Sequence, residues 1–342
     1  DVPSWRPDVD GEADIVEEIA RIAGFERIDA TPLPRADGVA KPTATRAQTI
    51  ERKVRRAAAA RGLNEAVTWS FIGEAEAAAF GGGAFSLVNP ISEEMKVMRP
   101  SLLPGLLAAT RNNLDRGAST VRLFEIGRRY LEGGERPTLT LILTGDTGQR
   151  DWQSGKPENF SAFDAKAESL ALLEAAGAPV ANLQTFPDAG ATWHPGRSAS
   201  LGLGPKTILA RFGELHPSLT RGLPAGTVAA EVYLDAIPET RSSGHARPAF
   251  APSALQPVKR DFAFIVPAQL AAGDLVRAIR GSDKAAITDA RLFDRFQSAD
   301  GLSLAVEVTL QPADKSFTDV EIAAISKRLV EAAEALGARL RA

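Results

Sequence analysis

The spacing of apolar residues predicts three regions of different architecture along the chain. In the first, Ile15, Ile19 and Ile22 recur at helical spacing and predict a helix over residues 14–23, which Gly24 ends. In the last, strand and helix patterns follow one another over residues 260–266, 271–281, 287–297, 302–310, 318–338 and 339–342. This βαββαβ order is that of the ferredoxin-like split βαβ plan.

The middle region predicts a sizeable antiparallel sheet with helices, which makes the chain α+β in class. Helices are expected at residues 44–61, 101–117 and 163–177. Strands are expected at residues 65–71, 85–90, 120–131, 138–146, 198–204, 207–215 and 228–237. Two polar, proline-bearing stretches, 29–44 and 238–250, are typical of linkers. We therefore expect domains at residues 1–40, 41–240 and 250–342.

Composition narrows the class of protein. With 44% hydrophobic and 24% charged residues, the chain has the balance of a folded globular protein. The absence of cysteine excludes disulfides and cysteine nucleophiles, and it suits a reducing compartment such as the cytoplasm. A net charge of -3 excludes a bulk polycation for nucleic acid but does not exclude a local basic patch. No apolar run is long enough to predict a membrane span.

The only methionines are Met95 and Met98, and the sequence opens at Asp1. We therefore expect that the chain is a piece of a longer protein whose natural start lies upstream.

Four acidic residues near the start form the densest carboxylate cluster: Asp8, Asp14, Glu17 and Glu18. The last three share one face of the predicted helix, with Asp8 just before it. Hard oxygen ligands at this density suit Mg²⁺. A helix start capped by Asp14, with further acids favoured by the helix dipole, explains the same pattern. Spacing alone favours the cap.

Other charged residues carry weaker signals. A basic run, consisting of Arg52, Lys53, Arg55, Arg56 and Arg61, suits either a phosphate backbone or, more commonly, a solvated helix face. His194 and His216 each precede a proline and are expected to be turn or core histidines that hydrogen-bond locally, because two histidines without cysteines make a poor zinc site. Arg122 and Glu125 on one predicted strand suggest a buried ion pair or a remnant ligand site.

Three residues of the last region suggest RNA contact. Asp294 and Phe296 have the same parity on the third predicted element, and Ser303 begins the adjoining strand. An aromatic ring for stacking, a carboxylate for base N–H groups and a hydroxyl on an open sheet face are how ferredoxin-like RNA binders read unpaired bases. Phe296 suits a core position equally well.

Several motifs in order resemble one family, the β subunit of bacterial phenylalanine–tRNA ligase, over its C-terminal portion. The motifs are PSWRPDVDGEADIVEEIARIAGFERI, NPISEEMKVMRPSLLPGLL, VRLFEIGRRY, WHPGRSA, GELHP, PVKRDFAFIV, ARLFDRFQ, LSLAVEVTL and SFTDVEI. The resemblance implies the end of a small winged-helix-like domain, a class II synthetase-like antiparallel-sheet module that is inactive, and a ferredoxin-fold anticodon-binding domain.

The same resemblance implies the roles of the candidate residues. Asp8, Asp14, Glu17 and Glu18 would bind Mg²⁺, and Asp294, Phe296 and Ser303 would contact the anticodon of tRNA(Phe). No residue of this chain would be catalytic, because the segment LGLGPKT lacks the arginine of a class II third motif. Phenylalanine and ATP would bind the partner α subunit in a cytoplasmic tetramer of two α and two β subunits, without DNA or membrane partners.

Two alternatives stay open at this point. A free-standing class II-like ligase would show ATP–pyrophosphate exchange on the isolated chain. A structural assembly module without RNA contact would have Asp294 and Phe296 buried.

Overall fold

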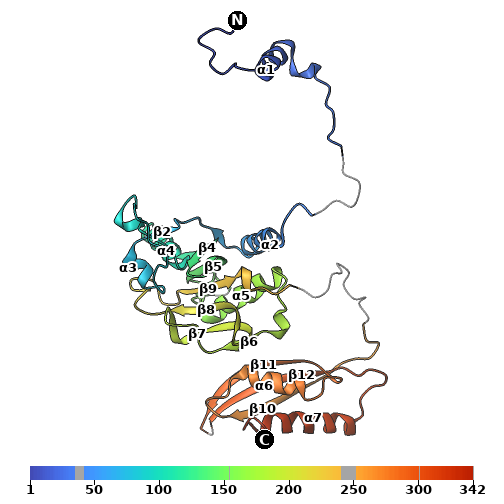
Figure 1. Cartoon of the computed structure of the whole chain (residues 1–342). Helices are drawn as coiled ribbons and strands as arrows, with labels where there is room; N and C mark the ends of the chain where they lie inside the picture. The colour runs from blue at the N-terminus through green and yellow to red at the C-terminus, as the bar shows by residue number, and fades with distance from the viewer. Residues whose placement is uncertain (35–41, 154, 240–251, 300, 342) are drawn as a thin grey trace. The chain divides into compact units, whose positions relative to one another are not determined.

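The structure is a computed structural model that describes residues 1–34, 42–153, 155–239, 252–299 and 301–341 (Figure 1). The chain forms two compact units, Asp1–Thr45 and Arg46–Ala342. Residues 35–41 of the first predicted linker and residues 240–250 of the second lie outside the described residues. Within the described ranges, no helix is both long and apolar enough to cross a membrane.

The first unit contains one α-helix, α1 (Glu12–Ala23), followed by the 3₁₀ turn η1 (Phe25–Arg27). The predicted helix is therefore present and begins two residues earlier than expected. Gly24 ends it with a φ of 98°, a backbone conformation that favours glycine. None of the residues of α1 is buried, so this unit has no apolar core of its own among the described residues.

The second unit contains a seven-stranded sheet in the order β1-β4-β5-β9-β8-β7-β6. Its strand pairs are antiparallel except for the β1–β4 pair, which is parallel. Its strands are β1 (Asn64–Glu65), β4 (Thr120–Leu131), β5 (Gly134–Gly145), β6 (Gln184–Phe186), β7 (Trp193–Gly204), β8 (Thr207–Leu215) and β9 (Val228–Tyr233). The elements around it are α2 (Arg46–Ala60), α3 (Glu74–Ala78), η2 (Glu93–Met95), α4 (Leu103–Asp115), α5 (Ala162–Ala175), η3 (Val180–Asn182) and η4 (Leu234–Ala236).

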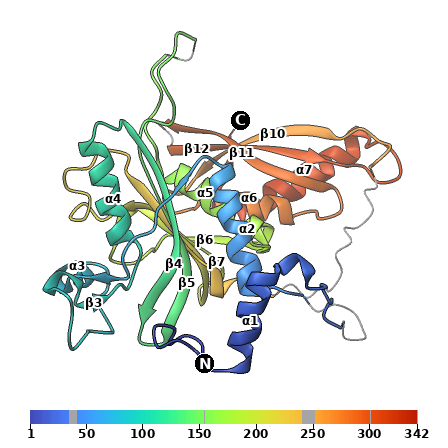
Figure 2. The ribbon, with the colours of Figure 1, turned by 90° about the horizontal axis from the view of Figure 1, so that it is seen from above.

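Helices cover both faces of this sheet. Ile50, Val54 and Ala58 of α2 recur every four residues and join the core that α5 also enters. Leu103, among others on α4, packs against the opposite face. Figure 2 shows α4 on one side of the long strands β4 and β5 and α2 on the other. The sheet is therefore a buried middle layer.

Two predicted strands of this region were largely wrong. Residues 65–71 contain only the end of β1 and the start of the short strand β2 (Phe71–Ile72), which pairs with β3 (Val97–Met98). Residues 85–90 hold no strand, only a single bridge from Ser86 to Val97. Alternation over so few residues cannot distinguish a strand from an extended loop.

The last elements form a four-stranded antiparallel sheet in the order β11-β12-β10-β13. They are β10 (Val258–Val266), α6 (Ala272–Gly281), β11 (Ile287–Ser298), β12 (Gly301–Leu310), α7 (Asp319–Glu334) and β13 (Arg339–Leu340). Both helices share one core with the strands. The predicted α+β class and the ferredoxin-like βαββαβ order are confirmed.

Candidate functional site

The open face of the four-stranded sheet holds all three residues predicted to contact RNA. Even-numbered residues of β12, from Leu304 to Leu310, enter the core with α6 and α7, so the odd-numbered residues face the other way. Across the pairing with β11, Phe296 lies opposite Ser303 and Asp294 lies opposite Ala305. The three predicted side chains are therefore on one face, on adjacent strands.

Their accessibility differs. Phe296 is 54% exposed and Asp294 is exposed, whereas Ser303 is only 4% exposed. Ser303 lies between Phe296 on β11 and Ile265 on β10, because β12 is an interior strand of the sheet. Phe296 and Asp294 are thus available to a ligand without rearrangement, and the Ser303 hydroxyl is not.

A second exposed aromatic residue lies beside this pair. The register of β11 shifts between Leu292 and Asp294, which leaves Phe293 as the extra residue of a bulge, 52% exposed. Strict alternation assigns Phe293 to the core side, so sequence reasoning missed it. A bulge has no reliable signal in a single sequence.

Charges further along the open face are balanced. Glu307 lies opposite Arg291 and forms ion pairs with Lys259 at 3.2 Å and with Arg291 at 2.9 Å. The hydrogen bond from Lys259, helped by Arg291, lowers the pKa of the Glu307 carboxyl. Both cations are therefore engaged with a carboxylate rather than free for phosphate.

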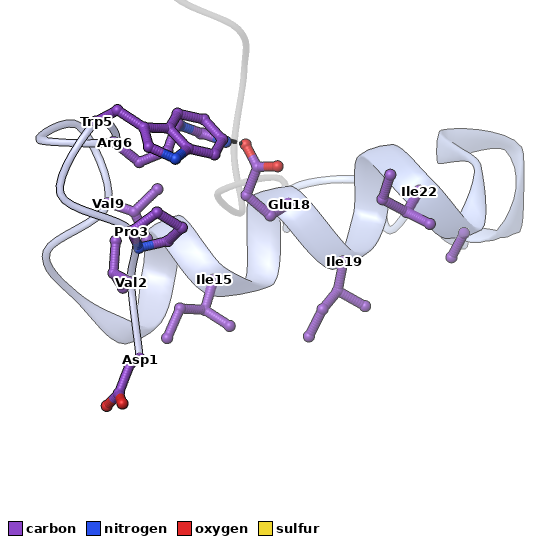
Figure 3. Close-up of a pocket in the computed structure, with 11 residues that line it drawn as sticks. Asp1, Val2, Pro3, Trp5, Arg6, Val9, Ile15, Glu18, Ile19 and Ile22 are labelled. Atoms are coloured by element: carbon purple, nitrogen blue, oxygen red, sulfur yellow. Dashed lines mark hydrogen bonds and ion pairs between the residues drawn. The ribbon is translucent and has the colours of Figure 1, made fainter.

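The acidic cluster of the first unit is organised around a cation of the protein itself. Arg6 Nη2 lies 2.7 Å from Asp8 Oδ2 and 2.6 Å from Glu18 Oε1, and Figure 3 shows Arg6 beside Glu18. Hydrogen bonds from Arg6 and Arg21 lower the pKa of Glu18 to about 2. Two carboxylates directed at one point suit Mg²⁺, which takes one or two carboxylates and keeps several waters, but Arg6 occupies that point.

The other two predicted ligands are placed differently. Asp14 is the third residue of α1 rather than its cap, and its Oδ2 accepts the backbone N–H groups of Asp10 and Gly11 at 2.9 and 2.8 Å. Glu17 is exposed, and its carboxylate forms no ion pair with a described residue. No group of three or more His, Cys, Asp or Glu side chains that could hold a metal occurs in the described part of the chain.

An apolar groove adjoins this cluster. It measures about 670 Å³ and is lined by Trp5, Ile15 and Ile19 together with Arg6 and Glu18. Figure 3 shows Ile15, Ile19 and Ile22 projecting from α1. The helical spacing of these isoleucines was predicted correctly, and in this structure they are exposed.

In the central module, which is the seven-stranded sheet with the helices that cover it, the predicted pairing of Arg122 with Glu125 was wrong. The two residues have opposite parity on β4, and Arg122 lies over the Phe160 ring on the other face of the strand. Glu125 pairs with Arg99 instead, at 2.8 Å, and both side chains are buried. Thr68 Oγ1 completes the cluster by donating to Glu125 at 2.7 Å and accepting from Arg99 at 2.9 Å.

The two histidines form local hydrogen bonds, as predicted. His194 Nδ1 accepts the backbone N–H groups of Gly196 and Arg197 at 3.0 and 3.1 Å. His216 Nδ1 lies 2.8 Å from Ser218 Oγ. In the basic run, Arg55 pairs with Glu65 and Arg61 pairs with Glu168, which fits a helix face with structural ion pairs.

The sequence was also compared with known families. The family described as "Phenylalanyl tRNA synthetase beta chain CLM domain" matches residues 30–234, which is more than half of the chain. The chain belongs to the phenylalanyl-tRNA synthetase β-chain family. A ferredoxin-fold anticodon binding domain matches residues 253–341, and a tRNA synthetase B5 domain matches residues 1–25. The open face of the four-stranded sheet thus lies within the matched anticodon binding domain.

The chain is also similar to individual proteins of this family. The chain is 59% identical over 99% of its length to the phenylalanine–tRNA ligase β subunit of Novosphingobium aromaticivorans. It is 56% identical over 100% of its length to that of Zymomonas mobilis, and 45% identical over 99% to that of Rhodopseudomonas palustris. In each case it spans 44% of the relative's length.

Proposed function

We propose that the chain is the part of a phenylalanine–tRNA ligase β subunit that supports the catalytic α subunit and holds tRNA(Phe) by its anticodon. The exposed pair Phe296 and Asp294, on the open sheet face of the domain that matches an anticodon binding family, is the observation that carries this proposal. In this proposal Phe296 stacks on an unpaired base, Asp294 accepts a base N–H, and Ser303 contributes its hydroxyl once its neighbours move aside.

The rest of the assembly belongs to the same proposal. The α subunit binds ATP and phenylalanine, two α and two β subunits form a cytoplasmic tetramer, and this chain contributes no catalytic residue. The segment LGLGPKT supports the last point, because it forms the end of β7, the turn and the start of β8, and it carries no arginine. The alternative of a module without RNA contact expects Asp294 and Phe296 to be buried, whereas both are exposed.

Replacing Phe296 with alanine is expected to weaken tRNA(Phe) binding by about 1–3 kcal/mol, or about five- to 150-fold, because one base loses its stacking partner. Fluorescence titration of labelled tRNA(Phe) with the complex of this β subunit and the α subunit measures the change. Phe163→Ala removes an exposed phenylalanine from α5 and serves as the matched control. Unchanged affinity in a folded Phe296→Ala complex would overturn the anticodon assignment.

We also propose that Asp8, Asp14, Glu17 and Glu18 hold Mg²⁺ after Arg6 moves aside. Calorimetric titration with MgCl₂ is expected to show binding to the wild-type complex and none to an Asp14→Ala, Glu18→Ala double variant. Arg6→Gln is expected to bind more tightly, because it removes the cation that Asp8 and Glu18 now share. Glu12→Ala, which removes a first-turn acid outside the set, is the control. Equal isotherms for wild type and double variant would refute the site.

A further inference from the structure

A row of polar side chains crosses one face of the buried seven-stranded sheet. Its members lie directly opposite one another from strand to strand: Glu125 on β4, Thr140 on β5, Glu231 on β9, Arg211 on β8 and Ser200 on β7. Opposite residues share a face of the sheet. All of them except Arg211 are buried. Burying a polar group costs stability unless it has a hydrogen-bond or charge partner. The partners of each side chain in this row therefore indicate whether the row is structural or binds a ligand.

Glu231 is a buried carboxylate without a cationic partner. It is 5% exposed and accepts hydrogen bonds from Ser101 Oγ at 2.6 Å and from the Tyr233 hydroxyl at 3.2 Å. Within the described ranges, no Lys, Arg or His nitrogen lies within 4.0 Å of its oxygens. Burial, and next the charge of Glu231, raise the pKa of Tyr233, so its hydroxyl stays a donor. Glu125 in the same row, by contrast, is fully paired with Arg99.

Arg211 faces Glu231 without pairing to it. The two residues are in direct register on β8 and β9, yet they form no ion pair, and Arg211 Nε is buried with no hydrogen-bond partner. A second guanidinium, that of Arg129, lies 4.3 Å from the centre of the Tyr233 ring, and its Nε donates to Thr138 at 2.7 Å. The guanidinium groups of Arg129 and Arg211 and the carboxylate of Glu231 thus lie close together, and Arg211 Nε still has a hydrogen bond to donate.

These groups line one cavity of about 350 Å³. Arg129, Arg211, Glu231 and Tyr233 form its polar wall, and Trp193 and Leu103 belong to its apolar wall. A volume near the lower end of the range for small-molecule sites, with an apolar wall and a few convergent charges, is the usual character of a ligand pocket. Elsewhere on this face of the sheet, apolar side chains such as Leu106 and Leu107 of α4 fill the space.

We propose that this cavity binds a small zwitterion of the α-amino acid class with an apolar side chain. Glu231 receives the ammonium group, Arg211 and Arg129 receive the carboxylate, and Trp193 contacts the side chain. A zwitterion supplies the Glu231 carboxylate and the two guanidinium groups each with an opposite charge, which neither an anion nor a cation alone does. The site is separate from the open face proposed for tRNA, and the amino acid substrate of the proposed ligase reaction is assigned above to the α subunit.

Calorimetry and saturation-transfer NMR on the 342-residue chain test this with L-phenylalanine and L-leucine as probes. At least one of them is expected to bind with a dissociation constant of about a millimolar or tighter. Phenethylamine, which lacks the carboxylate, and 3-phenylpropanoate, which lacks the ammonium group, are expected to bind at least about tenfold more weakly than L-phenylalanine. No saturable binding of either amino acid up to about 10 mM overturns the proposal. So does equal binding of 3-phenylpropanoate, which would indicate an anion site.

Variants separate this cavity from other binding surfaces. Arg211→Gln and Glu231→Gln are each expected to weaken amino acid binding at least about tenfold. Arg197→Gln, which removes a cation that pairs with Glu214 at 2.6 Å outside the cavity, is expected to bind as the wild type does. Thermal unfolding monitors the fold of each variant. Arg211 Nε has no hydrogen-bond partner and the Arg211 side chain forms no ion pair with a described residue, so Arg211→Gln keeps the test valid if Glu231→Gln fails to fold. Wild-type affinity in folded Arg211→Gln overturns the assignment.

Discussion

Replacing Glu125 with alanine is expected to lower the free energy of unfolding of the central module by about 3–5 kcal/mol, because the Arg99 guanidinium would be left buried without its counter-charge. Both side chains are almost fully buried, at 5% and 3% exposure, and their nitrogen and oxygen lie 2.8 Å apart. Thr68 bonds to both, so it would lose a carboxylate acceptor as well. Unfolding in urea, monitored by hydrogen exchange of the β4 and β5 amides, measures the loss of stability in this module.

An exposed ion pair between the same strand, β4, and helix α2 provides the control. Arg128 Nη1 lies 2.8 Å from Glu51 Oε1, but these side chains are 39% and 23% exposed. Solvent screens such a pair, so Arg128→Ala is expected to cost about 1 kcal/mol or less. A loss below about 1 kcal/mol for Glu125→Ala as well would show that Arg99 finds water or another acceptor, and would contradict the buried cluster.

Replacing Phe264 with alanine is expected to destabilise the four-stranded sheet domain by about 3–5 kcal/mol, because it leaves a cavity at the centre of the core. Phe264 has no exposed surface and lies on β10 between Leu304 of β12 and Leu340 of β13. Its ring also stacks with that of Phe262 at 6.4 Å between centroids. Hydrogen exchange of the β10 and β12 amides reports the loss, and tRNA(Phe) affinity is expected to fall as the domain opens.

This outcome differs from that of Phe296→Ala, which is expected to weaken tRNA binding while amide protection stays unchanged. Phe293→Ala removes an exposed ring from the same domain and is expected to change its stability by about 0.5 kcal/mol or less. Wild-type amide protection in Phe264→Ala would mean that the core repacks around the missing ring.

The sequence predicted elements well where their pattern is long. Strands β4, β8 and β12 run for nine to twelve residues with clear apolar patterning, and each was placed within a few residues. The two-residue strands β1, β2 and β3 carry no such pattern, and only tertiary pairing defines them. The same difference explains why β10, β11 and β12 were predicted while residues 85–90 were misassigned. The two-residue strand β13 completes the βαββαβ order and carries no such pattern either.

For the candidate sites, the sequence predicted which residues share a face but not what each residue contacts. Parity on β11 placed Asp294 and Phe296 on one face, while the burial of Ser303 depends on its neighbours in two other strands. The partner of Glu125 is Arg99, 26 residues away in a loop, and no periodicity connects them. Likewise, the carboxylate spacing around Asp14 gave no sign that Arg6 would draw Asp8 and Glu18 together.

The place of β13 in its sheet has a consequence for how the protein is made. All seven strands of the central sheet lie before residue 234, so that sheet has every strand it needs before Val258 leaves the ribosome. The four-stranded sheet instead needs residue 340 to reach residue 264 before its β10–β13 edge can close. Because domains fold as units in the order of synthesis, the central module can form while the chain is still being translated. The β10–β13 pair can form only after residue 340 has been synthesised, so the four-stranded sheet cannot be complete before that point.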